Sequence, residues 1–298
     1  MLTSSATAPH RPRRSVLYMP AANDRALAKA KTLPADAVIF DLEDAVAPDA
    51  KELARAKACA AVKDPGYGRR ELTIRINGTG TRWHDDDLLA AAAAGPDAIV
   101  VPKVSSAAEV HRLEAALEAA GAPGHTSLWG MLETPAAMLH AEEIAGASER
   151  LTVLVMGTND LAKELQAEHV PGRAPLLTGL RLCLLAARAT GTVILDGVYN
   201  DVSDAEGFEA ECRQGRQLGF DGKTLIHPRQ IEPCNRIFAP DEAEVEEART
   251  VLRVWEEALA AGRGVATVGG RMIENLHVEN AHRILATDAA IRAMAEAG

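Results

Sequence analysis

The chain alternates short apolar runs with longer helix-like segments, and this alternation repeats eight times between residues 14 and 240. The apolar runs span four to six residues and hold few polar positions. Such runs are typical of strands that are buried on both faces of a parallel sheet. The eight predicted strands are residues 15–19, 37–40, 72–76, 98–101, 127–132, 151–156, 192–195 and 223–226. Eight strand–helix units in succession predict an α/β protein whose strands close into a (β/α)₈ TIM barrel.

Nearly every predicted strand runs into polar or charged residues at its C-terminal end. In TIM barrels this is the end of the strands that carries the active site. An open, doubly wound parallel sheet is the alternative arrangement of the same units. A dinucleotide-binding sheet is disfavoured because no G-x-G-x-x-G string follows the first strand.

Helices are predicted between the strands. Asn23 is expected to cap the first helix, and Ser105 or Ser106 the helix that runs to Ala120. A helix-like segment with apolar Met138 and Ile144 connects the fifth and sixth strands. The other helices are expected at about residues 49–62, 85–94, 176–189 and 204–218.

Two carboxylates mark the ends of consecutive strands. Glu133 follows the fifth strand and Asp160 follows the sixth, so a parallel crossover places both at the same edge of the sheet. Neighbouring carboxylates repel unless a cation or a shared proton joins them. Mg²⁺ ranks first as that cation, with Mn²⁺ as the alternative. The competing interpretation is that Glu133 is a charge near a helix N-terminus and Asp160 caps a helix starting at Leu161.

The barrel is predicted to occupy residues 14–240, between a flexible N-terminal arm at residues 1–13 and a C-terminal extension at residues 241–298. The extension is expected to contain a long amphipathic helix, a short hairpin and a final helix. It is too short for a domain with its own core. We expect it to pack as a helical lid on the barrel or on a neighbouring subunit.

Composition excludes several classes of function. The net charge of −10 argues against nucleic acid as a partner, and no apolar run approaches the length of a membrane span. The start of the chain has no apolar core of a secretory signal. Four widely spaced cysteines without a C-x-x-C string are expected to be reduced, mostly buried thiols in a cytoplasmic protein.

Seven sequence strings, together and in this order, resemble the citrate lyase β-subunit-like family, which belongs with the HpcH/HpaI aldolases and includes malyl-CoA and citramalyl-CoA lyases. The resemblance runs from about Arg14 to the C-terminus. The strings are RSVLYMP from Arg14, FDLEDAV from Phe40, IRIN from Ile74, VPKV from Val101, LETP from Leu132, GTNDL from Gly157 and GFDGKTLIHP from Gly219.

The resemblance implies a Mg²⁺-dependent TIM barrel that assembles as a homotrimer or homohexamer. Such enzymes cleave or form the C–C bond between an acyl-CoA enolate and a 2-oxo acid such as glyoxylate or pyruvate. In the family, the glutamate of the L-E-T-P string and the aspartate of the G-x-x-D-L string bind the metal, and they match Glu133 and Asp160.

The resemblance also implies that Arg75 holds the carboxylate of the 2-oxo acid, for which a guanidinium offers two parallel donors. Asp41, Glu43 and Asp44 are expected beside the metal, where they hold its waters. The competing interpretation of Arg75 is a salt bridge with Asp41 or Glu43 at the ends of the strands. For the three acids it is surface charge with helix capping. Asp196, after the seventh strand, is a candidate for supporting the metal site from behind.

Coenzyme A is expected as part of the substrate. The segment after the first strand contacts CoA in the family, which assigns Tyr18, Arg25 and Lys29 or Lys31 to its phosphates and adenine. Lys103, after the fourth strand, is expected to be a structural charge inside the acidic mouth rather than a Schiff-base lysine. His84, His140 and His227 are isolated and are expected to be hydrogen-bonded scaffold or surface groups.

The C-terminal extension departs from the family pattern. Lyases of this family commonly bring an aspartate from a neighbouring subunit to exchange the proton on the acyl-CoA α-carbon. Here Gly270-Arg271-Met272-Ile273 leads to Glu274, which is one methylene longer. Misplacement by an ångström can cost about a hundredfold in rate.

Three functions are therefore carried forward. The first is a Mg²⁺-dependent lyase that cleaves or forms the C–C bond of a malyl-CoA-like thioester. The second is a thioesterase that hydrolyses (S)-malyl-CoA on the same scaffold. The third is a β-type citrate lyase subunit that works in a complex of several chains.

Overall fold

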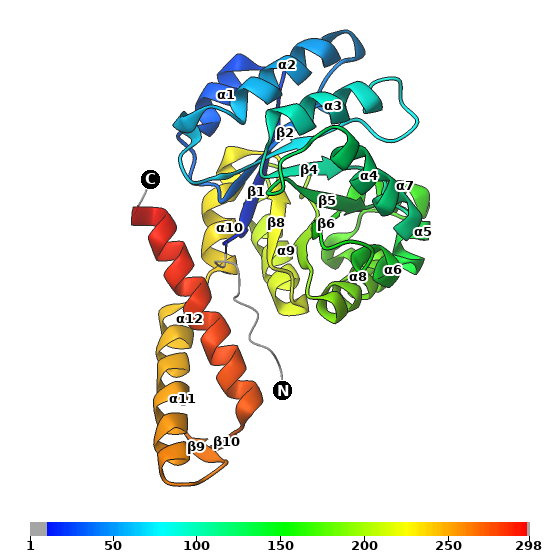
Figure 1. Cartoon of the computed structure of the whole chain (residues 1–298). Helices are drawn as coiled ribbons and strands as arrows, with labels where there is room; N and C mark the ends of the chain where they lie inside the picture. The colour runs from blue at the N-terminus through cyan, green and yellow to red at the C-terminus, as the bar shows by residue number, and fades with distance from the viewer. Residues whose placement is uncertain (1–10, 297–298) are drawn as a thin grey trace. The chain divides into compact units, whose positions relative to one another are not determined.

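In the computed structural model, which describes residues 11–296, eight parallel strands form a closed barrel in the order of the chain. Each strand pairs with the next, and β8 pairs with β1 to close the sheet on itself. Figure 1 shows the strands surrounded by helices. The predicted (β/α)₈ barrel is confirmed. Its strands are β1 (Ser15–Pro20), β2 (Ala37–Asp41), β3 (Glu71–Arg75), β4 (Ala98–Val101), β5 (Ser127–Leu132), β6 (Leu151–Met156), β7 (Val193–Asp196) and β8 (Gly222–Leu225).

The α-helices of the barrel follow its strands. They are α1 (Asp24–Ala30), α2 (Lys51–Ala61), α3 (His84–Ala94), α4 (Ala107–Ala119), α5 (Pro135–Leu139), α6 (Ala141–Ala145), α7 (Thr158–Glu164), α8 (Leu177–Thr190), α9 (Ala205–Leu218) and α10 (Ile231–Phe238). Short 3₁₀ helices stand at η1 (Pro48–Ala50), η2 (Pro65–Tyr67), η3 (Pro171–Leu176) and η4 (Pro228–Gln230).

Side-chain caps set several helix starts. The Asn23 side chain accepts hydrogen bonds from the N–H groups of Arg25 and Ala26, both at 3.1 Å, as predicted. Of the two serines before α4, Ser106 is the cap, because its hydroxyl accepts from the N–H of Glu109.

Three helical segments differ from the sequence prediction. The single helix expected between β5 and β6 is broken into α5 and α6 at His140, whose backbone leaves the helical region. Helix α7 begins at Thr158, so Asp160 lies in its first turn and the interpretation as a cap before Leu161 is wrong. Helix α10 was not predicted.

The core forms two layers separated by the barrel wall. Inside the barrel, Ile39, Val100, Trp129, Val153 and Leu195 belong to one fully buried cluster. The alternate residues of the same strands face outward and join the apolar faces of the surrounding helices in a second, larger cluster. Because both layers are apolar along the strands, polar side chains reach the barrel interior at the strand ends.

The predicted N-terminal arm ends earlier than expected. Residues 1–10 lie outside the described residues. Arg13 is bound: its guanidinium donates to both carboxylate oxygens of Glu71 at 2.6 and 2.8 Å and lies 5.5 Å from the ring centre of Trp129. The compact barrel unit therefore begins at Arg13 and runs to Phe238.

The C-terminal residues form a separate compact unit. It contains α11 (Glu242–Ala260), the hairpin strands β9 (Ala266–Val268) and β10 (Arg271–Ile273), and α12 (Asn275–Glu296). The two long helices pack on each other and on the hairpin around a small buried cluster that includes Val251, Ile273 and Val278. The expectation that this extension has no core of its own is wrong, whereas its packing on a barrel or a neighbouring subunit stays a prediction.

None of the helices between residues 11 and 296 combines the length and the apolar character that crossing a bilayer requires.

Barrel closure depends on a glycine. A Cβ atom on Gly222 would lie 1.8 Å from the carbonyl oxygen of Arg13, at the seam between β8 and β1. We expect Gly222→Ala to lower the free energy of unfolding by about 2 kcal/mol or more, because the strands must move apart. Urea unfolding measures this change. Gly124→Ala is the matched control, since its added Cβ meets open space. Equal stability of the two variants would contradict the argument.

Candidate active site

A pocket of about 290 Å³ lies at the C-terminal ends of the strands. Its walls combine acidic groups with one arginine and several apolar side chains. The lining residues are Tyr18, Asp41, Asp44, Ala45, Arg75, Met131, Glu133, Met156, Gly157, Thr158, Asn159, Asp160, Val198, Asn200, Thr224 and Ile226. Most of the residues that the sequence marked at strand ends therefore share one cavity.

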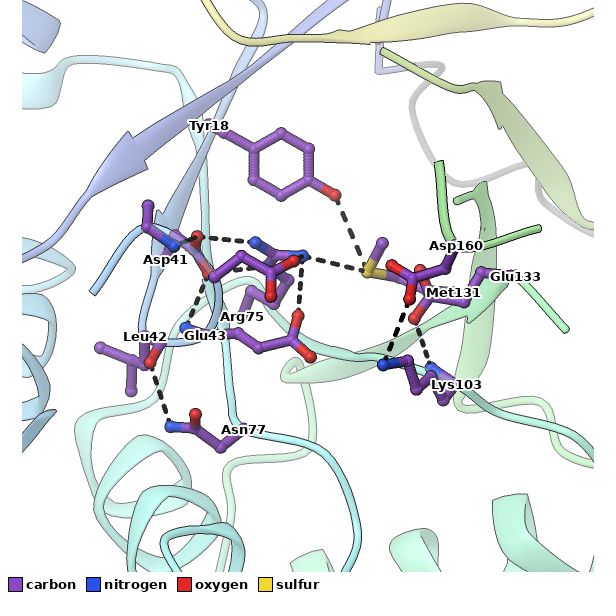
Figure 2. A network of polar contacts seen from close by, with 12 residues as sticks. Tyr18, Asp41, Leu42, Glu43, Arg75, Asn77, Lys103, Met131, Glu133 and Asp160 are labelled. Carbon is purple, nitrogen blue, oxygen red and sulfur yellow. Dashed lines mark hydrogen bonds and ion pairs between the residues drawn. The ribbon is translucent and has the colours of Figure 1, made fainter. Parts of the chain in front are cut away.

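Arg75 is the centre of one half of the pocket (Figure 2). It pairs in register with Asp41 on the neighbouring strand, and its guanidinium donates to both oxygens of that carboxylate at 2.6 and 2.7 Å. Its Nη1 lies 2.8 Å from Glu43 and 3.4 Å from Asp44. Burial lowers the pKa of Arg75, but Asp41, Tyr18 and Glu43 more than offset this effect and hold it well above its usual value. The salt bridges expected in the competing interpretation of Arg75 are present.

Hydrogen bonds fix the conformation of the acidic loop after β2, which carries Glu43 and Asp44. The Asp41 carboxylate accepts hydrogen bonds from the N–H groups of Glu43 and Ala45 at 2.9 and 3.0 Å. The Lys51 ammonium donates to the carbonyl oxygens of Leu42 and Glu43 at 2.7 and 2.6 Å. These bonds hold Asp41 and Glu43 in positions that face Arg75. The residues of β2 before Asp41 are all apolar.

Glu133 and Asp160 lie in the other half of the pocket. Glu133 is 2% exposed, and its Oε1 accepts the backbone N–H of Lys103 at 2.8 Å. The Lys103 ammonium lies 3.3 Å from Oδ1 of Asp160. Gly157 leaves room for the glutamate, because a Cβ atom there would lie 2.1 Å from Oε2 of Glu133. Figure 2 shows both carboxylates beside the lysine.

The backbone of Lys103 is unusual. Its φ of 57° lies in the left-handed region, which costs a non-glycine residue about 1–2 kcal/mol. Strain of this kind persists only where the surrounding structure compensates for it, often at functional sites. The compensation visible here is the pair of contacts to Glu133 and Asp160.

The carboxylates of the pocket are electrostatically crowded. Burial, followed by the charges of Glu43 and Asp160, raises the pKa of Glu133 to about 8. Burial also raises the pKa of Glu43 to about 7, although Arg75 opposes the shift. A cation between these groups would relieve the repulsion.

This donor set fits a hard divalent ion. Within residues 11–296, no group of three or more histidine, cysteine or acidic side chains is arranged as a metal cage. Mg²⁺ is commonly held by one or two carboxylates, with water and substrate oxygens completing its coordination. Glu133 and Asp160 supply such a pair on rigid elements.

Tyr18 lines the pocket, and its contact with CoA stays a prediction. Its ring lies 4.8 Å from the guanidinium carbon of Arg75, and its hydroxyl lies 3.8 Å from the sulfur of Met131. Burial raises the pKa of Tyr18 above its usual range. The ring and the Met131 side chain together form an apolar wall beside the arginine.

The four residues predicted to contact CoA are not brought together. Tyr18 faces the pocket, whereas Arg25 and Lys29 are exposed on α1. Lys31 is bound to Asp64 at 2.5 Å and lies 5.5 Å from the ring centre of Tyr67. Arg25 and Lys29 remain predicted contacts of CoA. Lys31 already forms an ion pair with Asp64.

Asp196 lies outside the pocket. It is fully buried at the end of β7, where its carboxylate accepts from Arg173 at 2.6 Å and from Lys223 at 3.1 Å. Glu211 completes this separate network through Lys223 at 2.7 Å. The expectation that Asp196 supports the metal site is therefore corrected: it neutralises two buried cations of the barrel.

Glu274 is exposed and directly follows β10 in the C-terminal unit. Its backbone N–H donates to Nδ1 of His277 at 3.1 Å. Its role in proton exchange stays a prediction.

The three histidines act as predicted, as scaffold or surface groups. Nδ1 of His84 bonds to the carbonyl oxygen of Asn77, His140 lies near Glu143, and His227 caps η4.

Sequence reasoning missed several supporting residues. From the sequence, Lys51 looks like a surface residue of a helix. Only the tertiary structure places its ammonium against the loop of Leu42 and Glu43. Asn77 similarly donates to the carbonyl oxygen of Leu42 at 3.1 Å. Gly157 carried a signal that could have been used, because a glycine directly after a buried strand often marks close approach of another group.

Comparison with known proteins places the chain in context. A model of the family described as HpcH/HpaI aldolase/citrate lyase matches residues 14–228, and a model described as a C–C bond lyase of the TIM-barrel fold matches residues 177–293. The chain is 51% identical over 282 residues to a (3S)-malyl-CoA thioesterase of Cereibacter sphaeroides, covering 95% of this chain and 96% of that protein. It is 37% identical over 280 residues to the citrate lyase subunit beta of Escherichia coli, covering 92% and 93%.

A solved structure is similar along nearly the whole chain. The protein CitE from Mycobacterium tuberculosis, in complex with magnesium, acetoacetate and coenzyme A, superposes with a TM-score of 0.76 at 30% identity. The match covers 95% of this chain and 100% of that one.

The raised pKa of Glu133 makes stability depend on pH. The folded protein holds this proton up to about pH 8, whereas an unfolded glutamate releases it near 4.5. Without metal, the free energy of unfolding should therefore fall as pH rises between these values, by roughly 2–4 kcal/mol from this group. Urea unfolding in EDTA at pH 5 and 8.5 measures the loss. We expect it to be smaller in Glu133→Gln than in the surface control Glu118→Gln; equal losses would contradict the assignment.

Proposed function

Because the chain belongs to the HpcH/HpaI aldolase/citrate lyase family, we propose that it is a Mg²⁺-dependent enzyme that hydrolyses the thioester of a malyl-CoA-like substrate. The observation that carries this choice is the 51% identity to (3S)-malyl-CoA thioesterases over nearly the full length of both chains. The citrate lyase beta subunits are more distant, at 37% identity or slightly less. The reaction adds water to malyl-CoA and releases malate and free CoA.

Arg75 is suited to bind the free carboxylate of the substrate. Asp41 already occupies two of its donors and fixes the plane of the guanidinium. The third direction, at Nη1, is shared by Glu43 and by Asp44, whose side chain is 71% exposed. Asp44 is therefore the partner that a substrate carboxylate can displace with little rearrangement.

Glu133 and Asp160 would hold Mg²⁺, which fits the crowding of negative charge in their half of the pocket. When bound, this ion polarises the oxygens of the substrate as a Lewis acid. The similar CitE complex holds both magnesium and coenzyme A, and we extend them to this chain. Mn²⁺ is the alternative ion.

Glu43 is the group best placed to move a proton. Its pKa of about 7 matches the requirement for a general base that works near neutral pH. It lies against Arg75, and therefore beside the place where the substrate carboxylate would bind. We assign it the removal of a proton from the attacking water. Tyr18 and Met131 form the wall that keeps bulk water from Arg75.

The parts of the chain outside the pocket complete the proposal. Arg25 and Lys29 on α1 offer exposed positive charge for the phosphates of CoA. The C-terminal unit carries Glu274 and would bring it to the active site of a neighbouring subunit in a homotrimer or homohexamer.

Cleavage of the C–C bond, the reaction expected first from the sequence, is the second candidate. The match of residues 177–293 to a C–C bond lyase model favours it, because that segment includes most of the C-terminal unit. In that reaction malyl-CoA yields glyoxylate and acetyl-CoA, and Arg75 binds the carboxylate of the 2-oxo acid. A subunit role like that of citrate lyase beta would require partner chains for activity.

Product analysis separates these reactions. Incubation of the purified chain with malyl-CoA and Mg²⁺ should release malate and CoA, whereas glyoxylate and acetyl-CoA would identify the lyase. Excess EDTA should abolish turnover, and Glu133→Gln or Asp160→Asn should lower it by roughly a hundredfold or more. Full turnover in EDTA would refute the metal site, and inactivity of the chain alone would favour a multi-chain complex.

Exchange at the acyl-CoA α-carbon tests Glu274. In D₂O, a lyase that uses this glutamate should exchange α-protons of acetyl-CoA, and Glu274→Ala should lose the exchange. The neighbouring surface variant Glu279→Ala serves as the control. Mass spectrometry of the recovered acetyl-CoA measures the deuterium. Exchange that is unchanged in Glu274→Ala would remove this residue from the mechanism.

A further inference from the structure

Lys103 contacts both carboxylates of the proposed metal pair through two different groups. Its backbone N–H donates to Glu133 at 2.8 Å, and its ammonium lies 3.3 Å from Asp160. Glu133 directly follows β5, and Asp160 lies in the first turn of α7, the helix that follows β6. A residue that follows a further strand, β4, therefore connects them.

The left-handed backbone conformation of Lys103 allows this one residue to make both contacts. With φ at 57°, Lys103 presents its own N–H to Glu133 while its side chain reaches Asp160. A glycine would adopt this conformation without a steric penalty and would keep the N–H donor. A glycine would lack the ammonium. The contact with Asp160 is therefore what a lysine adds at this strained position.

We propose that Lys103 is a positioning residue whose ammonium substitutes for the divalent ion when the site is empty and must leave Asp160 when the ion binds. This inference rests on the proposed metal site at Glu133 and Asp160. It goes further by giving the chain an internal cation that competes with the metal.

Exposure of the two side chains permits this exchange. The Lys103 side chain is 49% exposed and that of Asp160 is 25% exposed, so the ammonium can turn into water without crossing the core. The bond from the Lys103 N–H to Glu133 does not depend on the side chain and persists in both states. Glu133 is thus held permanently, whereas Asp160 changes partner from lysine to metal.

Binding of Mn²⁺ alone, without substrate, tests the proposal. Isothermal titration of the full chain should give a dissociation constant roughly three- to tenfold lower for Lys103→Met than for the wild type, because the competing charge is gone. Lys103→Gly should show the same gain, and Lys103→Arg should stay close to the wild type. In EDTA, Lys103→Met should melt at a lower temperature than the wild type, and saturating Mn²⁺ should close that gap.

Lys163→Met is the matched control. Lys163 is exposed in the last turn of α7, the helix that also carries Asp160, so the variant removes an equal charge outside the pocket. Affinity of Lys103→Met that is unchanged or weaker would overturn the proposal. A gain in Lys103→Gly alone would also overturn it, because it would assign the effect to backbone strain.

Metal binding at Glu133 and Asp160 and the role of Lys103 are tested by different outcomes. Wild-type protein that binds no Mn²⁺, or binds it equally well after Glu133→Gln and Asp160→Asn, would refute the metal site itself. Normal binding that depends on both acids, combined with an unaltered Lys103→Met, would refute the role of the lysine alone.

Discussion

Negative charge concentrated at the mouth of the barrel is the constraint on which the rest of the site depends. Asp41, Glu43, Glu133 and Asp160 converge there, and burial makes their mutual repulsion costly. Arg75 balances the charge in one half of the pocket. In the other half, Lys103 is the only cationic side chain that pairs with Asp160 among residues 11–296. Its backbone is in the strained left-handed conformation. The difference between the halves explains why one is suited to a substrate carboxylate and the other to a metal.

The scaffold makes this arrangement possible at low conformational cost. Asp41 ends β2 and Glu133 directly follows β5, and most other residues of these strands are buried in one of the two core layers. Glu43 lies in the loop after β2, and Asp160 lies in the first turn of α7. Rigid strands position side chains more precisely than mobile loops do. The supporting bonds from Lys51 and from the Lys103 N–H then orient the carboxylates. A second buried network, in which Asp196 joins Arg173 and Lys223, uses the same kind of charge pairing for stability rather than chemistry.

Family membership and geometry contribute different parts of the functional argument. The family includes proteins named as thioesterases and as lyases, and the similar CitE structure holds magnesium and coenzyme A. The site as seen in one chain is compatible with either reaction, because both proposals use Arg75 and the pair Glu133 and Asp160. The group that would distinguish them, Glu274, is carried by a separate unit and not by the barrel.

The sequence by itself determined the eight-unit barrel, the strand ends at Arg75 and Glu133, and most helix starts, because periodicity and capping are local properties of the chain. Tertiary structure alone decided which charges meet. It brought Tyr18 into the pocket, removed Asp196 from it, and placed Lys103 between two acids that are 30 and 57 positions away in the chain. The physical reason is that burial and the contacts between distant side chains depend on how strands and helices pack, which no local pattern encodes.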